Sequence, residues 1–304
     1  TTSNSLVGSQ ANDMVGIGGV TALSNGNYVV ISFGWNNGSV DSAGAVTWGN
    51  GTSGITGTVT SSNSLVGSTS GDEVGNAGIT ALSNGNYVVN SYTWDNGTIV
   101  DAGAVTWGSG TTGISGVVNS TNSLVGSHAD DGVGNGGITA LSNGNYVVCS
   151  IYWDNGTITD VGAVTWGNGT SGVNGNINSA NSLVGGKGGD LVGYGDIISL
   201  SNGNYVVSSF YWDDGAVANV GAVTWGSGTT GVKGTISAIN SLVGTHVNDL
   251  VGGGGLTALT NGNYVVGSVY WDNGTISDTG AVTWGNGTTG TTGTVTTSNS
   301  LVGS

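Results

Sequence analysis

The feature that most constrains the fold of this chain is an internal repeat of 59 residues. The pentapeptide NSLVG begins at Asn4 and returns every 59 residues until Asn299. No insertion interrupts the series, and a fixed period of this kind indicates a repeat architecture such as a propeller or solenoid. We expect residues 1–304 to form a single repeat domain. Its repeats are 4–62, 63–121, 122–180, 181–239 and 240–298, with a partial repeat at 299–304.

Each repeat contains four segments with the composition of β-strands. In the second repeat they are residues 77–82, 86–94, 103–110 and 113–126, and we expect a bulge or bend within the last. An Asn-Gly pair in the sequence SNGN separates the first two segments, which is a strong signal for an antiparallel hairpin. Abundant Gly, Asn, Ser and Thr beside Val, Ile, Trp and Tyr likewise predict many short strands and tight turns.

Four short antiparallel strands at a fixed period are typical of a propeller blade. We therefore predict an all-β fold, a five-bladed β-propeller with four-stranded blades of 59 residues. The alternative is a β-solenoid, although solenoid coils usually repeat every ~20 to 30 residues. Both chain ends carry TTSNSLVGS, one copy more than a closed ring of five needs. Either the sequence was cut from a longer array, or one copy lies outside the ring and, as an unpaired edge strand, invites a neighbouring subunit.

The charge balance argues against two classes of partner. The chain has only two basic residues, Lys187 and Lys233, against 17 acidic ones, so its formal net charge is −15. Binding to nucleic acid requires many Lys and Arg contacts to phosphates. No apolar run approaches the ~18 residues of a membrane span. We expect neither nucleic-acid binding nor membrane insertion.

The chain ends and the single cysteine give two smaller expectations. The N-terminus has no initiator Met, positive region or apolar stretch, so we interpret the sequence as a mature or excised fragment. Cys149 cannot form an internal disulfide. Because Ile, Asn, Ser and Gly hold its place in the other repeats, we expect a tolerated position without a reactive role.

The order of motifs in each repeat resembles the FG-GAP blade of integrin-like β-propellers. The resemblance runs through NSLVGSxxxDxVG, as in residues 122–134, then ITALSNGNYVV, then DxGAVTWGNG, as in residues 160–169. It implies a propeller whose blades often bind Ca²⁺ through alternating aspartates. Here that place reads SNGNY, without a carboxylate, so we expect no Ca²⁺ site of the family type, no other metal site and no cofactor.

The repeats also look like the near-identical repeats of very large secreted bacterial surface proteins. This likeness implies a location outside the cell or at its surface, with an adhesive or structural role.

One aspartate in each repeat precedes a Val-Gly pair after one variable residue. A hard cation needs six or more oxygen ligands, and these residues have no such neighbours in the sequence. Asp accepts backbone N–H groups well in turns. We therefore predict that these residues brace a loop. They are Asp13, Asp72, Asp131, Asp190 and Asp249.

The ten tryptophans form two series. One ends the GAVTW segments, and we expect it to pack between blades: Trp48, Trp107, Trp166, Trp225 and Trp284. The other begins WDNG-type loops: Trp35, Trp94, Trp153, Trp212 and Trp271. Together with the aspartates that follow, these are candidate ligand-binding residues, because a ring face can pack on a sugar while carboxylates take its hydroxyls. These aspartates are Asp95, Asp154, Asp213 and Asp272. The alternative is that the indoles cover blade ends with their N–H bonded to a carbonyl.

Nothing in the sequence points to catalysis. The two histidines share a freely varied loop position, Gln10, Thr69, His128, Lys187 and His246. We find no nucleophile-base constellation, zinc spacing or phosphate loop. We predict a non-enzymatic, extracellular structural or adhesive module of a bacterial surface protein or fibre, which associates with itself or with neighbouring repeats. The alternative is a lectin-like propeller that binds a glycan through the second Trp series and the variable loops.

Overall fold

The computed structural model describes residues 1–303, and this part of the chain contains strands and turns but no helix. It divides into two compact lobes, which are described separately. The first lobe comprises residues 1–140 and 167–177, and the second comprises residues 141–166 and 178 onward. Among residues 1–303 no helix has the length and apolar character needed to cross a membrane.

The strands are short and evenly spaced. Those of the first lobe are β1 (Leu6–Val7), β2 (Val20–Ala22), β3 (Tyr28–Ser32), β4 (Ala45–Gly49), β5 (Gly57–Thr58), β6 (Ser64–Val66), β7 (Ile79–Ala81), β8 (Tyr87–Ser91), β9 (Ala104–Gly108), β10 (Gly116–Val117), β11 (Ser123–Val125), β12 (Gly137–Ala140) and β15 (Gly175–Asn176). Those of the second lobe are β13 (Tyr146–Ser150), β14 (Ala163–Gly167, whose last residue belongs to the first lobe), β16 (Ser182–Val184), β17 (Ile197–Ser199), β18 (Tyr205–Ser209), β19 (Ala222–Gly226), β20 (Gly234–Thr235), β21 (Ser241–Val243), β22 (Leu256–Ala258), β23 (Tyr264–Ser268), β24 (Ala281–Gly285), β25 (Gly293–Thr294) and β26 (Ser300–Val302).

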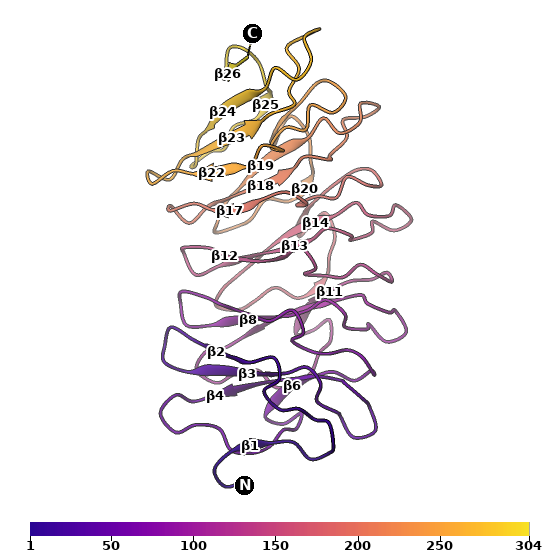
Figure 1. Ribbon diagram of the computed structural model, residues 1–304, viewed down its shortest axis with the longest axis vertical. Coiled ribbons are helices and arrows are strands. Elements are labelled where there is room, and N and C mark those ends of the chain that lie inside the picture. The colour runs from indigo at the N-terminus through magenta and orange to yellow at the C-terminus, as the bar shows by residue number, and fades with distance from the viewer. Residues whose placement is uncertain (304) are drawn as a thin grey trace. The chain divides into compact units, whose positions relative to one another are not determined.

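The sheets are antiparallel meanders of four strands. We number them sheet 1 (β2-β3-β4-β6) and sheet 2 (β7-β8-β9-β11) in the first lobe, and sheet 4 (β17-β18-β19-β21) and sheet 5 (β22-β23-β24-β26) in the second lobe. Strands β13, β14 and β16 form the second-lobe part of sheet 3. Within each lobe the first strands of successive sheets are neighbours: β2 lies beside β7, and β17 lies beside β22, as Figure 1 shows for the second pair. The prediction of an all-β fold built from repeated small sheets is confirmed.

A fifth strand of two residues joins sheets 1 to 4 from further along the chain, whereas sheet 5 has four strands. For example, β10 pairs in parallel with β6, and β25 pairs in parallel with β21. The segment 113–126, predicted as one broken strand, is therefore two strands that lie in different sheets. Asn122 accounts for the break: its side chain accepts the Asn119 N–H at 2.9 Å and donates to the Val117 carbonyl at 3.0 Å. The SLV segment that opens each sequence repeat is thus the last strand of the preceding sheet.

The SNGN segment forms the predicted hairpin with a three-residue loop. In sheet 2, the Leu82 N–H donates to the Asn86 carbonyl at 2.8 Å, and the Gly85 N–H donates to the Leu82 carbonyl at 3.1 Å. The positive φ of 87° falls on Gly85, where a residue without Cβ avoids strain. This loop sets the register in which β7 and β8 pair, because loop length and turn type fix the pairing of a hairpin.

The tyrosine after SNGN packs across the sheet onto a glycine. In sheet 4, Tyr205 of β18 lies opposite Gly226 of β19. A Cβ on Gly226 would overlap the Tyr205 ring, so the glycine at the end of GAVTWG makes room for the aromatic side chain. The Tyr205 hydroxyl accepts the Val232 N–H at 3.1 Å, and burial raises the pKa of this side chain to about 12.

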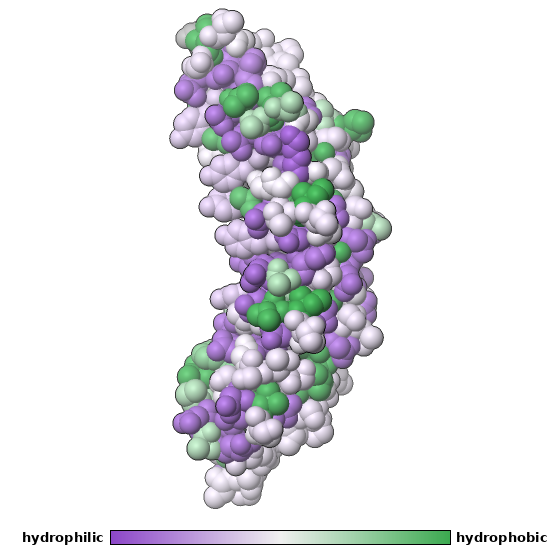
Figure 2. Space-filling view, turned by 90° about the vertical axis from the view of Figure 1, so that its right-hand side faces the viewer, coloured by the Kyte–Doolittle hydropathy of each residue, from purple (hydrophilic) through white to green (hydrophobic). Residues whose placement is uncertain are grey.

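The hydrophobic core lies between successive sheets. In the first lobe one cluster joins Val29, Val46 and Leu65 of sheet 1 to Tyr87 and Val89 of sheet 2. Figure 2 shows that apolar residues on the surface seen there form separate patches among polar ones. Each buried Val or Leu stabilises the fold by roughly 1.5–3 kcal/mol. A sheet of this protein therefore depends on the next sheet for much of its stability.

Candidate functional site

The repeated aspartates hold the loop that leads from one sheet to the next. The side chain of Asp72 accepts the N–H groups of Ser68 and Thr69 through Oδ2, at 2.7 and 2.8 Å, and that of Asp95 through Oδ1, at 3.0 Å. Its carboxylate thus ties two loops together. The other four are buried in the same way and accept N–H groups from the same loop positions: Asp13, Asp131, Asp190 and Asp249.

The aspartates that follow the second Trp series are also bound to backbone. The Asp95 Oδ1 atom accepts the Asp101 N–H at 2.9 Å. Asp154, Asp213 and Asp272 accept an N–H six residues ahead in the same way. In the first repeat Asn36 accepts the Ser42 N–H at 2.9 Å. Because a neutral amide serves as well, this position requires an acceptor oxygen and not a charge.

Burial raises the pKa of both Asp72 and Asp190. Their hydrogen bonds to backbone N–H groups lower the pKa in opposition, while the nearby charges of Asp95 and Asp213 raise it further. Burial also raises the pKa of Asp101, which lies near Asp95 and Asp130. The ionised form of these three carboxyl groups is therefore disfavoured.

The second Trp series is buried, with side chains only 3–4% exposed: Trp35, Trp94, Trp153, Trp212 and Trp271. A ring in this environment has no free face for a sugar. The expected hydrogen bond from the indole N–H to a carbonyl is also absent, within residues 1–303, from four of the five: Trp35, Trp94, Trp153 and Trp271. Their loop position suggested access to solvent, but the adjacent sheet and loops cover them.

The first Trp series forms a clamp between sheets. The Trp48 indole N–H donates to the Gly110 carbonyl at 3.0 Å, and the side chains of Asn25 and Asn27 donate to the same carbonyl at 2.8 and 2.7 Å. Gly113 follows in the connection between β9 and β10, where a Cβ would press on the Trp48 ring. Three donors of one sheet thus converge on one carbonyl of the next sheet. We call this arrangement the Asn-Trp clamp.

The clamp recurs in both lobes. Its acceptors are the carbonyls of Gly110 and Gly169 in the first lobe and of Gly228 and Gly287 in the second. Sequence reasoning treated SNGN only as a turn and so missed this role. A signal was present, because both asparagines are identical in every repeat whereas the turn itself requires only the glycine.

The position of Cys149 faces the next sheet. Its Sγ atom lies 3.3 Å from the Gly193 carbonyl, and burial raises the pKa of the thiol to about 12. At the same position Asn90 donates to the Gly134 carbonyl at 2.9 Å, and Ser208 to the Gly252 carbonyl at 3.2 Å. The position thus accommodates several small or medium side chains, and a buried thiol is a poor nucleophile.

The variable loop position, which is Lys187 in the fourth repeat and His246 in the fifth, lies beside the repeated aspartates and those that follow the second Trp series. Lys187 approaches Asp213 at 3.8 Å, and His246 approaches Asp249 at 3.7 Å. The ligand atoms of His246, Asp249 and Asp272 lie within 4.8 Å of one another. However, both oxygens of Asp249 already accept backbone N–H groups, which turns their lone pairs away from an additional cation.

Fold and contacts define an all-β tandem-repeat protein whose repeated polar side chains bind neighbouring parts of the same chain. A family described as "Repeat of unknown function (DUF5650)" matches residues 1–17, 22–76, 81–135, 140–194, 199–253 and 258–304. The chain belongs to this family. From residue 22 onward the successive matches begin at a constant interval, which is the period of the repeat in the sequence. A search of curated proteins finds no match. The likeness to FG-GAP blades stays a prediction.

Proposed function

We propose that this chain is a non-enzymatic structural or adhesive module of an extracellular bacterial surface protein or fibre. The observation that carries the proposal is the Asn-Trp clamp. The side chains that never vary from repeat to repeat bind the next sheet, whereas an enzyme would direct such residues into a cleft. The resemblance to repeats of secreted surface proteins supports the location.

The five-bladed propeller and its solenoid alternative differ in the dimensions they predict in solution. A compact chain of this length, as in a closed propeller, has a radius of gyration of about 19 Å, whereas a solenoid is longer and has a clearly larger value. Solution scattering distinguishes the two arrangements.

Surface labelling tests the location and the role. Antibodies raised against this chain should label intact, unpermeabilised cells of the source organism, or fibres shed from them. A permeabilised sample provides the matched control. Labelling only after permeabilisation would contradict the proposal.

A lectin remains the second candidate, with its site moved to other aromatic residues. In the second lobe Tyr194 lies 5.6 Å from Phe210 and 5.2 Å from Tyr211, measured between ring centroids. Tyr194 is exposed, so this cluster offers the ring surface that the buried indoles lack. Binding on a glycan array that Tyr194→Ala abolishes would support the lectin. Binding that Tyr194→Ala leaves unchanged, or no binding at all, would exclude this cluster as the site.

A further inference from the structure

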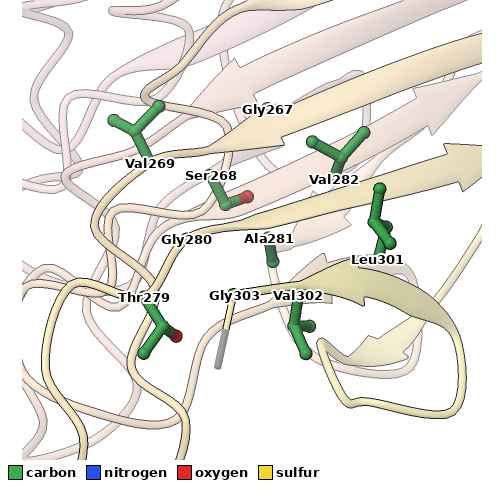
Figure 3. A pocket seen from close by; sticks show the side chains of 10 residues that line it. All are labelled: Gly267, Ser268, Val269, Thr279, Gly280, Ala281, Val282, Leu301, Val302 and Gly303. Atoms are coloured by element: carbon green, nitrogen blue, oxygen red, sulfur yellow. The ribbon is translucent and has the colours of Figure 1, made fainter.

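The last sheet of the second lobe has an uncovered apolar face. Val265 lies opposite Trp284, and Val282 lies opposite Leu301, so these four side chains share one face of sheet 5. Val282 is 47% exposed, Trp284 52% and Leu301 78%. Together with neighbouring residues, Val282 and Leu301 line a hollow of about 560 Å³ (Figure 3). We call this surface the outward face of sheet 5.

In sheets 1 and 4 the same positions are buried by the sheet that follows in the same lobe. Val206, Val223 and Leu242 of sheet 4 correspond to Val265, Val282 and Leu301, and their exposure is 1% or less. The side chains that cover them belong to sheet 5 and its flanking loops: Val251, Tyr264, Val266, Trp271, Ala281 and Val295. The equivalent cluster between sheets 1 and 2 uses the same positions. The structure thus shows what kind of surface covers an outward face.

The first lobe carries a matching set of residues in front of sheet 1. At the six covering positions it has the same residue types, Val15, Tyr28, Val30, Trp35, Ala45 and Val59. Strand β1 lies against this set: Leu6 packs against the cluster that contains Trp35, Ala45 and Val59, and these three are buried. Leu6 pairs with Gly57 of β5, as Leu242 of sheet 4 pairs with Gly293 of β25. Strand β1 therefore occupies the place that the last strand of a complete sheet takes elsewhere.

Strands β1 and β26 lie in the same nine-residue sequence, TTSNSLVGS, at residues 1–9 and 296–304. We propose that β26 of one copy of this chain replaces β1 on β5 of a second copy, with Leu301 opposite Gly57. The outward face of sheet 5 then packs on the covering set in front of the partner's sheet 1. This deepens the proposed function, because it names the partner through which the module would assemble.

The sequence around β1 is identical to that around β26, so the exchange is driven by the sheet that β26 brings with it. Exchanging β1 for β26 leaves the strand pairing itself unchanged, since the residues are the same. However, β26 brings a complete sheet whose Val265, Val282 and Trp284 become buried, and burial of apolar surface drives association. The Trp284 N–H would also gain the Gly51 carbonyl, the counterpart of the Gly110 acceptor in the Asn-Trp clamp. Because the two faces differ, the contact is head-to-tail and extends into linear species.

One substitution placed at two positions tests the exchange. Light scattering across a wide concentration range should show the mass of the wild-type chain rising above 29.7 kDa. Leu301→Asp should abolish this rise. Leu6→Asp should lower the concentration needed for it by about tenfold, a change of roughly 1.4 kcal/mol, because it weakens the competing strand. Ile239→Asp, at an apolar residue that is 89% exposed, is the matched control and should leave association unchanged.

Circular dichroism should show that all three variants keep the wild-type fold. If wild type and Leu6→Asp both remain at 29.7 kDa, or if Leu301→Asp associates like wild type, the exchange is wrong. Those results would leave the surface-labelling test of the proposed function untouched, so the two failures are distinguishable.

Discussion

Sheets 4 and 5 carry the same apolar residues at corresponding places, yet one outward face is buried and the other is exposed. Leu242 is 1% exposed and its counterpart Leu301 is 78% exposed. Trp225 donates its N–H to the Gly287 carbonyl at 3.0 Å, whereas Trp284 is half exposed. The comparison teaches that residue type alone does not determine burial here. A side chain of the outward face is buried only if another sheet follows, so stability accumulates from contacts between neighbours.

The largest expected effect comes from removing the leucine at the two places. Leu242→Ala should lower the free energy of unfolding by about 2–5 kcal/mol, since it leaves a cavity between sheets. Leu301→Ala should change it by less than about 0.5 kcal/mol, as for most surface substitutions. Urea unfolding followed by fluorescence measures both. Equal effects would contradict the comparison.

A brace aspartate should give the next largest effect. Asp190→Ala leaves the N–H groups of Gly186, Lys187 and Asp213 without their acceptor, and hydrogen bonds to a charged group contribute roughly 1.5–3 kcal/mol. We expect a loss of about 2 kcal/mol in the same unfolding measurement. Asp214→Ala, at the exposed neighbouring aspartate, is the control. A loss of similar size in the control would show that the effect is not specific to the brace and would contradict its role.

The Asn-Trp clamp should contribute less, because two asparagines share its acceptor. Trp225→Phe keeps the apolar ring but removes the N–H, and a hydrogen bond of this kind contributes about 0.5–1.5 kcal/mol. Trp284→Phe should have almost no effect, since its place in the clamp has no acceptor in a single copy. Thermal melts of the two variants side by side provide the measurement. A larger loss in Trp284→Phe would contradict the assigned clamp.

The smallest effect is a dependence of stability on pH. Burial holds the pKa of Asp72 and Asp190 above their ordinary value of 3.8, so the folded chain binds these protons more tightly than the unfolded chain. Protonation of these two groups therefore contributes stability that is greatest below pH 3.8 and is lost as pH rises through the folded-state pKa. Urea midpoints measured between pH 4 and 7 should fall with rising pH. Asp190→Asn should reduce the slope, and a steeper slope in that variant would contradict the assignment.

Much of the fold could be predicted because its determinants are local. The glycine in SNGN fixes a turn and the flanking Val and Tyr residues form strands, so the hairpin between β7 and β8 was readable. The division of segment 113–126 between two sheets could not be predicted. That division depends on the pairing of β10 with β6, and the strands β7, β8 and β9 separate these two along the chain. No local pattern records such a distant pairing.

The candidate site likewise contains contacts that are local in the sequence and contacts that are not. The loop around Asp72 could be predicted because its hydrogen-bond partners Ser68 and Thr69 lie four and three residues away. The burial of Trp94 and the clamp on Gly110 could not, because both depend on a neighbouring sheet or loop. A pattern of identical residues indicates that a position matters but not what it touches.

The Asn-Trp clamp and the shared covering positions have a consequence for the gene. Because each junction in a lobe uses the same set of side chains, duplicating or deleting one whole repeat would create no junction of a new kind. Recombination between near-identical segments could therefore change the number of repeats while every junction kept its chemistry. Selection could then adjust the reach of such a protein by copy number alone, independently of its point mutations.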